Sequence, residues 1–329
     1  MLRKIAITTL ALGVLATTAH AEITLKASHQ WPGGKGDARD EMVQIIAREV
    51  SKANVGLDIK VYPGKSLFKP KAQWQAMVKG QLDISAFPLD YASRYHPQFS
   101  ATLMPGLVKN HDHALRLNSS PFMADIKKII DDANIIVLSD AWLAGGFASK
   151  KNCILEPESM KGQVTRAAGP AFEQMLVGAG ASISSMSSSA IYTAMQTGVL
   201  DAANTSSGSF VSYRIFEQVK CLTAPGEHAL WFMYEPILMS KKSWNKLNLE
   251  QQNALRAAGK VAEEYMTSKA KGLDDKLVTV FKENGVEVVE MTAEQAAAWK
   301  AIAQKTSYKI FAESVPGGKE LIEKALAVE

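Results

Sequence analysis

Residues 23–61 read ITLKASHQWPGGKGDARDEMVQIIAREVSKANVGLDIKV, and this stretch predicts the fold of the chain. Apolar and polar side chains alternate over 23–27, as in a half-buried strand, and the Trp-Pro-Gly-Gly segment that starts at Trp31 interrupts the alternation. A helix is expected over 37–52, because its apolar residues recur on one face. A second strand is expected over 55–61. This order is that of a βαβ unit, which is typical of a largely parallel sheet with right-handed crossovers.

The same alternation continues along the chain. A helix is expected at 70–79, a helix from about Pro170, and strands at 82–86, 135–138, 162–166, 182–184 and 231–239. From Asn248 the pattern changes, because Asn248 and Gln251 form a capping box and helix-forming residues follow to about Glu283. At about 1.5 Å per residue such a helix is about 50 Å long. A helix of this length is expected to span two domains or to bend.

The first 21 residues have the composition of a secretory signal. MLRK at positions 1–4 is positively charged, residues 5–18 are almost wholly apolar or small, and Ala19–Ala21 has the small-x-small pattern of a cleavage site. The alternative is a membrane anchor, but an apolar run of about 14 residues is too short for about 30 Å of hydrocarbon. The sequence therefore predicts a signal peptide over 1–21 and a mature protein in the periplasm.

The whole chain has the composition of a globular protein, with 47% apolar and 21% charged residues. Its 37 basic and 33 acidic residues nearly balance, which gives no sign of a surface for nucleic acid. Lys65, Lys69 and Lys71 form a local cluster that is expected to be an ordinary solvated surface.

Roughly 300 residues after the signal are enough for two domains. We predict an α/β protein in which domain I contains 22–143 and 231–271, and domain II contains 144–230 and 272–329. In open α/β sheets, ligands lie beyond the carboxyl ends of the strands. Aromatic residues follow several predicted strands at this edge, and they favour a pocket there: Trp31, Phe87, Tyr91 and Trp142.

Cys153 and Cys221 are the two cysteines of the chain. An even pair in an oxidising compartment favours one disulfide, and two separate buried thiols are the alternative. Neither a Cys-x-x-Cys motif nor a neighbouring histidine points to a metal or to redox catalysis.

No motif of an enzyme stands out, and no cofactor is predicted. Gly64–Ser66 resembles the end of a phosphate-binding loop, but Ile59 occupies the position of the partner glycine. His111–His113 is expected to be a solvated helix start rather than a metal site. The serine-rich run 184–189 has no Gly-x-Ser-x-Gly motif and no histidine close by. A hydrolase assembled from distant residues stays an alternative.

Two segments resemble the solute-binding proteins of TRAP transporters, the DctP family. SMKGQVTR at 159–166 is similar to that family's Met-Lys-Gly-x-x-x-Arg segment, and AIYTAMQTGVLD at 190–201 is similar to its Tyr-x-Ala-Leu-Gln-Thr-Gly-Val-Val-Asp-Gly stretch. KGQLDI at 79–84 and Tyr62-Pro63 also fit. The resemblance covers nearly the whole chain after the signal.

The resemblance implies a periplasmic protein that closes two α/β domains, with a cleft between them, around a small organic acid. Delivery would be to an ion-driven TRAP permease with a small and a large subunit, without catalysis. The family's arginine corresponds to Arg166, which would hold the carboxylate, because a guanidinium forms a bidentate pair with it. From the residues alone, a surface salt bridge is an equally good interpretation of Arg166.

Several departures from the family pattern bear on the ligand. The family's Gly-x-Glu-Asn-Pro reads AANTS at 202–206, so Thr205 replaces the asparagine that often reaches the ligand. Gly146 stands where sialic-acid binders have a second arginine. One arginine with many hydroxyls favours a monocarboxylate, such as an aromatic, hydroxy or keto acid. The residues expected to bind the ligand are Arg166, Gln30, Trp31, Phe87, Tyr91, Trp142, Ser188, Asn204, Thr205, Ser206 and Trp231.

Three other functions stay open at this point. A binding protein of an ATP-driven importer is disfavoured by the continuous late helix and by Gln-Thr-Gly-Val at 196–199. A sensor module would use the same closed form, and sequence does not separate it from a transport protein. A periplasmic hydrolase would need a triad or a metal site that the motifs do not provide.

Overall fold

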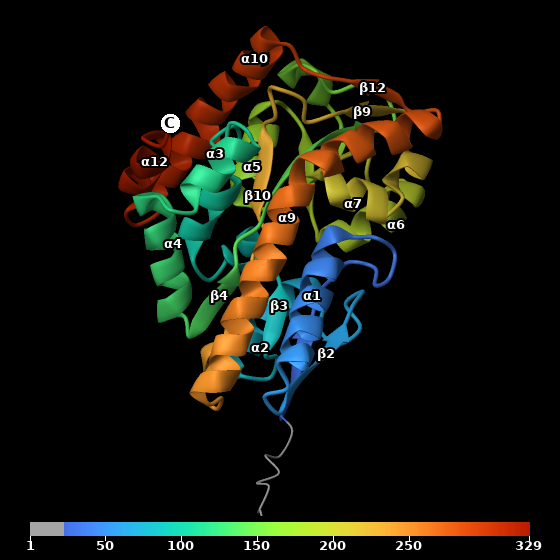
Figure 1. Ribbon diagram of the computed structural model, residues 1–329. Coiled ribbons are helices and arrows are strands. Elements are labelled where there is room, and N and C mark those ends of the chain that lie inside the picture. Colours follow the sequence, from blue (N-terminus) through green and yellow to red (C-terminus); the bar gives the residue numbers. More distant parts are fainter. Residues whose placement is uncertain (1–22) are drawn as a thin grey trace, which may run out of the picture.

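The computed structural model describes residues 23–329, so the predicted signal peptide lies outside the described residues (Figure 1). The opening segment forms β1 (Ile23–Ser28), α1 (Ala38–Ala53) and β2 (Leu57–Tyr62), as predicted. Asp37 caps α1 by accepting a hydrogen bond from the backbone N–H of Arg39. The strands form a five-stranded sheet in the order β2-β1-β3-β11-β4, completed by β3 (Ile84–Ala86), β4 (Ile135–Ser139) and β11 (Ile237–Ser240).

A second sheet has seven strands. Its order is β12-β9-β5-β8-β6-β7, and β10 also pairs with β5. The bounds are β5 (Trp142–Ser149), β6 (Val164–Ala167), β7 (Ser182–Ser185), β8 (Ala202–Ser206), β9 (Cys221–Thr223), β10 (Trp231–Tyr234) and β12 (Glu287–Val289). The expected largely parallel sheet was wrong in one respect: five of the ten strand pairings are antiparallel. The reason is that β5 runs antiparallel to β8, β9 and β10, and β11 runs antiparallel to β3 and β4. A local alternation of strands and helices does not reveal these directions.

Helices cover both faces of each sheet. In the first sheet, α1 and the long helix α9 (Leu249–Glu283) lie on one face, while α2 (Gln73–Lys79) and α4 (Pro121–Asp132) cover the other. In the second sheet, α5 (Pro170–Gly178) and α10 (Ala293–Ala303) lie on one face, opposite α6 (Ile191–Gln196) and α7 (Ser207–Ser212). The remaining helices are α3 (His111–Leu117), α8 (Lys241–Trp244), α11 (Lys309–Ser314) and α12 (Gly318–Leu326). Short 3-10 helices span Pro70–Ala72, Leu89–Ala92, Pro97–Leu103, Pro157–Met160, Ser188–Ala190 and Ile215–Gln218, and a short π-helix spans Gln304–Tyr308.

The predicted long helix is confirmed. Asn248 and Gln251 form its capping box, and α9 runs past both sheets, contacting α1 and β4 in one half and α7 and β12 in the other (Figure 1). Gly259 lies within α9 where the helix packs closely against β4. A Cβ at this position would lie 2.3 Å from the carbonyl oxygen of Leu138, so glycine lets α9 approach β4 closely.

Besides α9, two short segments pass between the sheets. One joins β4 to β5 through Asp140 and Ala141, and the other joins β10 to β11 through Glu235 and Pro236. The backbone N–H of Glu235 donates to the carbonyl of Ala141 over 2.8 Å, so the two segments lie side by side. The expected two-domain α/β architecture is confirmed by these two sheets and their crossings.

The exact domain limits stay a prediction. β10, expected with domain I, pairs with β5 in the second sheet, and α12 packs against α4. The Cys153–Cys221 disulfide is confirmed, and it closes a loop of 68 residues beside the second sheet. Across residues 23–329, no helix combines the length and the apolar character needed to cross a membrane.

Candidate functional site

Arg166 lies at the end of β6 and is buried, with 1% of its surface exposed. Its Nε donates to the carbonyl of Met186 over 3.0 Å, its Nη1 to the carbonyl of Asn204 over 2.7 Å, and its Nη2 to the hydroxyl of Tyr91 over 3.2 Å. All three acceptors are neutral. Among residues 23–329, no carboxylate forms a salt bridge with Arg166.

These three hydrogen bonds do not use all the N–H donors of the Arg166 guanidinium. A guanidinium has five N–H donors, so the three hydrogen bonds leave one free N–H on each terminal nitrogen. Two such donors match the two oxygens of one carboxylate. Burying a cation is costly because desolvation removes its water, and the buried carboxylates of Asp90 and Glu235, which feel the charge of Arg166, form no salt bridge with it. Arg166 therefore keeps two N–H donors that no described residue uses.

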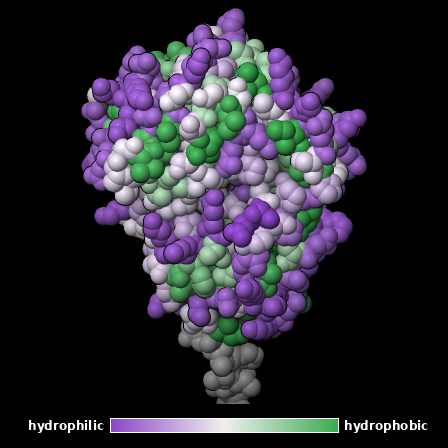
Figure 2. Space-filling model, turned by 180° about the vertical axis from the view of Figure 1, so that it is seen from behind, coloured by the Kyte–Doolittle hydropathy of each residue, from purple (hydrophilic) through white to green (hydrophobic). Residues whose placement is uncertain are grey.

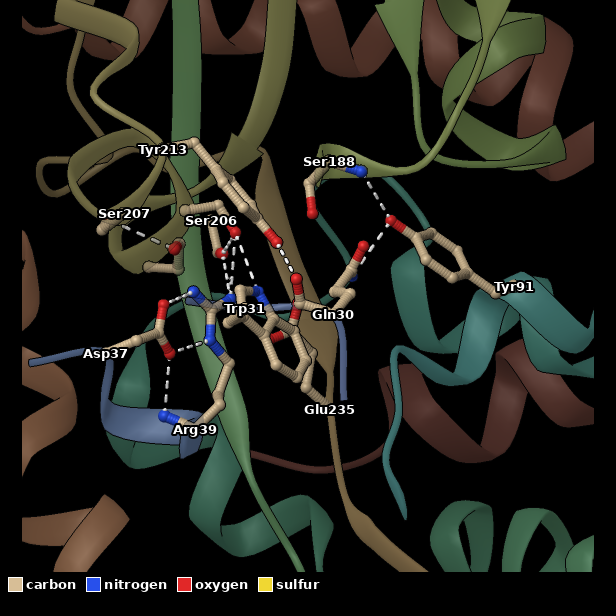
Figure 3. Close-up of polar contacts among 12 residues, drawn as sticks. Gln30, Trp31, Asp37, Arg39, Tyr91, Ser188, Ser206, Ser207, Tyr213 and Glu235 are labelled. Carbon is tan, nitrogen blue, oxygen red and sulfur yellow. Dashed lines mark hydrogen bonds and ion pairs between the residues drawn. The ribbon is translucent and has the colours of Figure 1, made fainter. Parts of the chain in front are cut away.

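The hydroxyl of Tyr91 organises the surroundings of Arg166. Besides Arg166, it accepts hydrogen bonds from the backbone N–H of Ser188 over 2.9 Å and from Nε2 of Gln30 over 3.4 Å (Figure 3). Phe87 packs edge-to-face on the Tyr91 ring, with the ring centroids 6.1 Å apart. Tyr91 thus links a strand end of the first sheet to the loop after β7 in the second sheet.

A second arginine, Arg39, lies nearby, and sequence analysis missed it. Arg39 is fully buried and pairs with Asp37 at 2.7 Å and with Glu235 at 2.9 Å (Figure 3). Burial alone would lower the pKa of Arg39, but the two carboxylates hold it above its usual value. Its guanidinium also lies 4.2 Å from the ring centroid of Trp31. No motif signals this cluster, because its members come from distant segments.

The Arg39 cluster ties the two halves together. Arg39, on α1, donates to the hydroxyls of Ser206 (2.8 Å) and Ser209 (3.0 Å), which belong to the β8–α7 segment. The Tyr213 hydroxyl, in the same half, donates to the carbonyl of Gln30 over 2.9 Å. Because both its ionic partners are in place, Arg39 is a structural cation, whereas Arg166 forms no salt bridge within residues 23–329.

Gly146 cannot be replaced by a longer residue without moving the backbone. A Cβ there would lie 2.1 Å from the carbonyl oxygen of Thr223. Position 146 is thus closed to a side chain in this strand packing.

Asp90 is a buried carboxylate close to the same place. Its Oδ1 accepts from the hydroxyl of Ser93 over 3.0 Å, and its Oδ2 has no partner within the described part of the chain. Burial raises the pKa of Asp90 to about 6. Gly169 makes room for it, since a Cβ at Gly169 would lie 1.7 Å from Oδ2.

The structure brings most of the expected ligand residues together. Those in the hydrogen-bonded network of Arg166, Tyr91 and Arg39 are Gln30, Trp31, Ser188, Asn204 and Ser206, with Phe87 supporting Tyr91. Thr205 is buried in β8, where it pairs with Gly146.

Two expected tryptophans lie elsewhere. The Trp142 indole donates to Asn118 over 2.8 Å and lines a separate pocket of about 240 Å³ between α3 and α9. Trp231 is 1% exposed and packs in the core of the second sheet, close above Gly145. Both begin strands of the second sheet, and aromatic residues at strand starts have no preference for the ligand edge.

Two α/β halves, with a buried arginine in β6 that pairs with no carboxylate of residues 23–329, are typical of the solute-binding class. The model of the bacterial extracellular solute-binding protein family 7, DctP, matches residues 35–314. The chain therefore belongs to the DctP family, and the resemblance noted in the sequence is confirmed.

Individual relatives agree with this assignment. A solute-binding protein of Albidiferax ferrireducens is 38% identical over 305 residues, covering 92% of this chain and 90% of that protein. The crystal structure of a TRAP periplasmic solute-binding protein from Rhodoferax ferrireducens, with bound malonate, superposes with a TM-score of 0.88 at 38% identity, covering 92% of this chain and 96% of that one. A protein from Sulfurospirillum deleyianum with bound succinate shares the fold, with a TM-score of 0.86 at 22% identity, covering 94% of this chain and all of that one.

Proposed function

We propose that this protein captures a small organic acid outside the inner membrane and holds one carboxylate on the two free N–H groups of Arg166. The observation that carries this proposal is the contrast between two buried arginines. Arg39 has two carboxylate partners, whereas Arg166 has three neutral acceptors and no counter-ion among the described residues. A carboxylate ligand would supply the missing charge.

The acid is proposed to be a monocarboxylate that carries a hydrogen-bond donor, such as a hydroxyl group. Two features support this choice. Arg166 is buried and makes no salt bridge with a described residue, and position 146 has no room for a second arginine. Asn204 Oδ1 is a buried acceptor without a partner in the described chain, and its orientation is fixed because Nδ2 donates to the carbonyl of Arg166 over 3.0 Å.

We further propose that the loaded protein delivers the acid to a TRAP permease of a small and a large membrane subunit, and that it catalyses no reaction. Membership of the DctP family and the similarity to TRAP periplasmic solute-binding proteins support this role. A transport protein and a sensor would share the same closed form, so binding alone does not separate the two roles. Delivery to a permease is tested by uptake of labelled acid in cells with and without this protein. Unchanged uptake in cells that lack it would favour a sensor.

Ligand binding is tested by thermal unfolding of the purified protein against hydroxy, keto and aromatic monocarboxylates, malonate, succinate, and the neutral amide of each acid. A ligand at 100 times its Kd adds about 2.7 kcal/mol. With about 2.1 cal/mol/K of unfolding entropy per residue, this raises the midpoint by about 4 °C. We expect a shift with at least one acid and none with its amide. Equal shifts with an acid and its amide would contradict a carboxylate site.

A further inference from the structure

A second pocket lies where two segments from different halves of the molecule face each other. Its volume is about 520 Å³. One wall is the connection between β2 and α2, which contributes Lys65, Lys69 and Lys71. The other wall is the loop after β7, with three serines at alternate positions, Ser185, Ser187 and Ser189. Strongly hydrophilic side chains also lie between the two halves on the face opposite α9 (Figure 2).

The three lysines are not held in salt bridges with described residues, although the charge of Lys71 also acts on the buried carboxylate of Asp90. Within residues 23–329, none of them forms a salt bridge with a carboxylate, unlike Lys127 or Lys151, which pair at 2.6 Å and 3.0 Å. The Lys71 ammonium lies 5.6 Å from the centre of the Tyr91 ring. Opposite the lysines, serine hydroxyls can donate to an anion as well. The pocket thus presents positive charge on one wall and neutral donors on the other.

The pocket adjoins the Arg166 site through shared residues. Met186 lines the pocket, and its carbonyl accepts the hydrogen bond from Arg166 Nε. Tyr91, beneath Lys71, contacts both Arg166 and the Ser188 backbone. An anion in the pocket is therefore separated from the guanidinium by the Met186 segment and by the Tyr91 ring.

The charges inside the protein explain why such a pocket is needed. Around Arg39 and Arg166 lie three buried carboxylates, Asp37, Asp90 and Glu235. They offset the field of the two arginines, so the interior by itself attracts an approaching acid weakly. A cleft mouth lined by unpaired positive charge raises the local concentration of an anionic ligand and its association rate.

We infer that the pocket between Lys65–Lys71 and Ser185–Ser189 is a docking site for the anionic ligand, from which the carboxylate passes to Arg166. The passage to Arg166 rests on the proposed function, whereas anion binding in the pocket does not. The relevant chemistry is that of a small carboxylate held by ammonium and hydroxyl groups, without an arginine.

Anion binding in the pocket is tested by NMR in the full protein carrying Arg166→Ala, with malonate as the probe and sodium chloride of equal ionic strength as reference. We expect saturating amide shifts at Ser187 and Ser189 with malonate. They should disappear in K65Q/K69Q/K71Q. A matched control, K260Q/K269Q/K305Q, removes the same charge from exposed lysines outside the pocket and should keep the shifts. Absent shifts, or shifts that survive K65Q/K69Q/K71Q, would overturn the docking site.

The kinetic consequence is tested with Arg166 intact, by stopped-flow tryptophan fluorescence with an acid that binds. At low ionic strength, K65Q/K69Q/K71Q should lower the association rate constant about tenfold and flatten its salt dependence, with little change in dissociation. An association rate equal to that of K260Q/K269Q/K305Q would overturn the inference. A different result would contradict the proposed function, namely that Arg166→Ala binds the acid as tightly as the parent protein.

Discussion

Arg39 and Arg166 are equally buried, but replacing each by methionine should change the stability of the ligand-free protein differently. Arg39→Met removes the common partner of Asp37 and Glu235 and leaves two buried carboxylates uncompensated. Breaking a buried ion pair in this way costs about 3–5 kcal/mol. With about 2.1 cal/mol/K of unfolding entropy per residue, the melting midpoint of a chain of this length should fall by about 5–8 °C.

Arg166→Met removes a buried cation that has no salt-bridge partner in the described part of the chain. The change loses three hydrogen bonds from a charged group to neutral acceptors, at about 1.5 kcal/mol each. It also removes the desolvation penalty of the cation, which is several kcal/mol in a protein interior. The two terms nearly cancel, so the stability of the ligand-free protein should change by about 1 kcal/mol or less.

The assay is urea unfolding of both variants without ligand, followed by thermal unfolding with and without an acid that binds the parent. Arg39→Met should unfold at lower urea, while Arg166→Met should match the parent and lose the stabilisation by the acid. Equal destabilisation by the two variants would refute the reasoning, because Arg166 would then be a structural residue like Arg39.

Further predictions concern the surroundings of the site. Gly169→Ala should destabilise the protein by about 1–3 kcal/mol, because its Cβ would overlap Asp90, whereas Gly272→Ala, with open space around it, should be neutral or stabilising by urea unfolding. Cys153→Ser with Cys221→Ser should cost about 4 kcal/mol for a loop of 68 residues, and a melting midpoint equal to that of the oxidised parent would contradict this. Because the folded-state pKa of Asp90 is raised to about 6, the folded protein binds more protons than the unfolded chain between about pH 4 and 6. Stability should therefore fall by about 3 kcal/mol as the pH rises through this window, and Asp90→Asn should remove that slope; parallel pH profiles would show that Asp90 titrates normally.

Local patterns in the sequence predicted much of the fold. The alternation at β1, the amphipathic helix α1 and the capping box of α9 are all properties of short segments, and each was found close to its expected bounds. The direction of β5, β10 and β11 was not predictable in this way, because strand pairing depends on partners far away in the chain.

The residues of the candidate site also differ in whether the sequence could predict them. Arg166 and Tyr91 could be found from a family motif and from a position after a strand. Arg39 and Glu235 could not, because they are 196 residues apart in the chain and neither belongs to a motif. The cluster Lys65, Lys69 and Lys71 was expected to be an ordinary solvated surface. The opposite wall of the pocket, Ser185–Ser189, lies more than a hundred residues away along the chain, so sequence alone could not reveal the pocket.

The central claim is that Arg166 holds the carboxylate of the ligand, and calorimetric titration of one acid into the parent, Arg166→Lys and Arg166→Met tests it most directly. Losing a charge-assisted pair of hydrogen bonds costs about 3 kcal/mol or more, which is roughly a hundredfold in affinity. We expect at least this loss in Arg166→Met and an intermediate affinity in Arg166→Lys, because an ammonium keeps the charge but lacks the bidentate fork. Binding to Arg166→Met within threefold of the parent would contradict the claim.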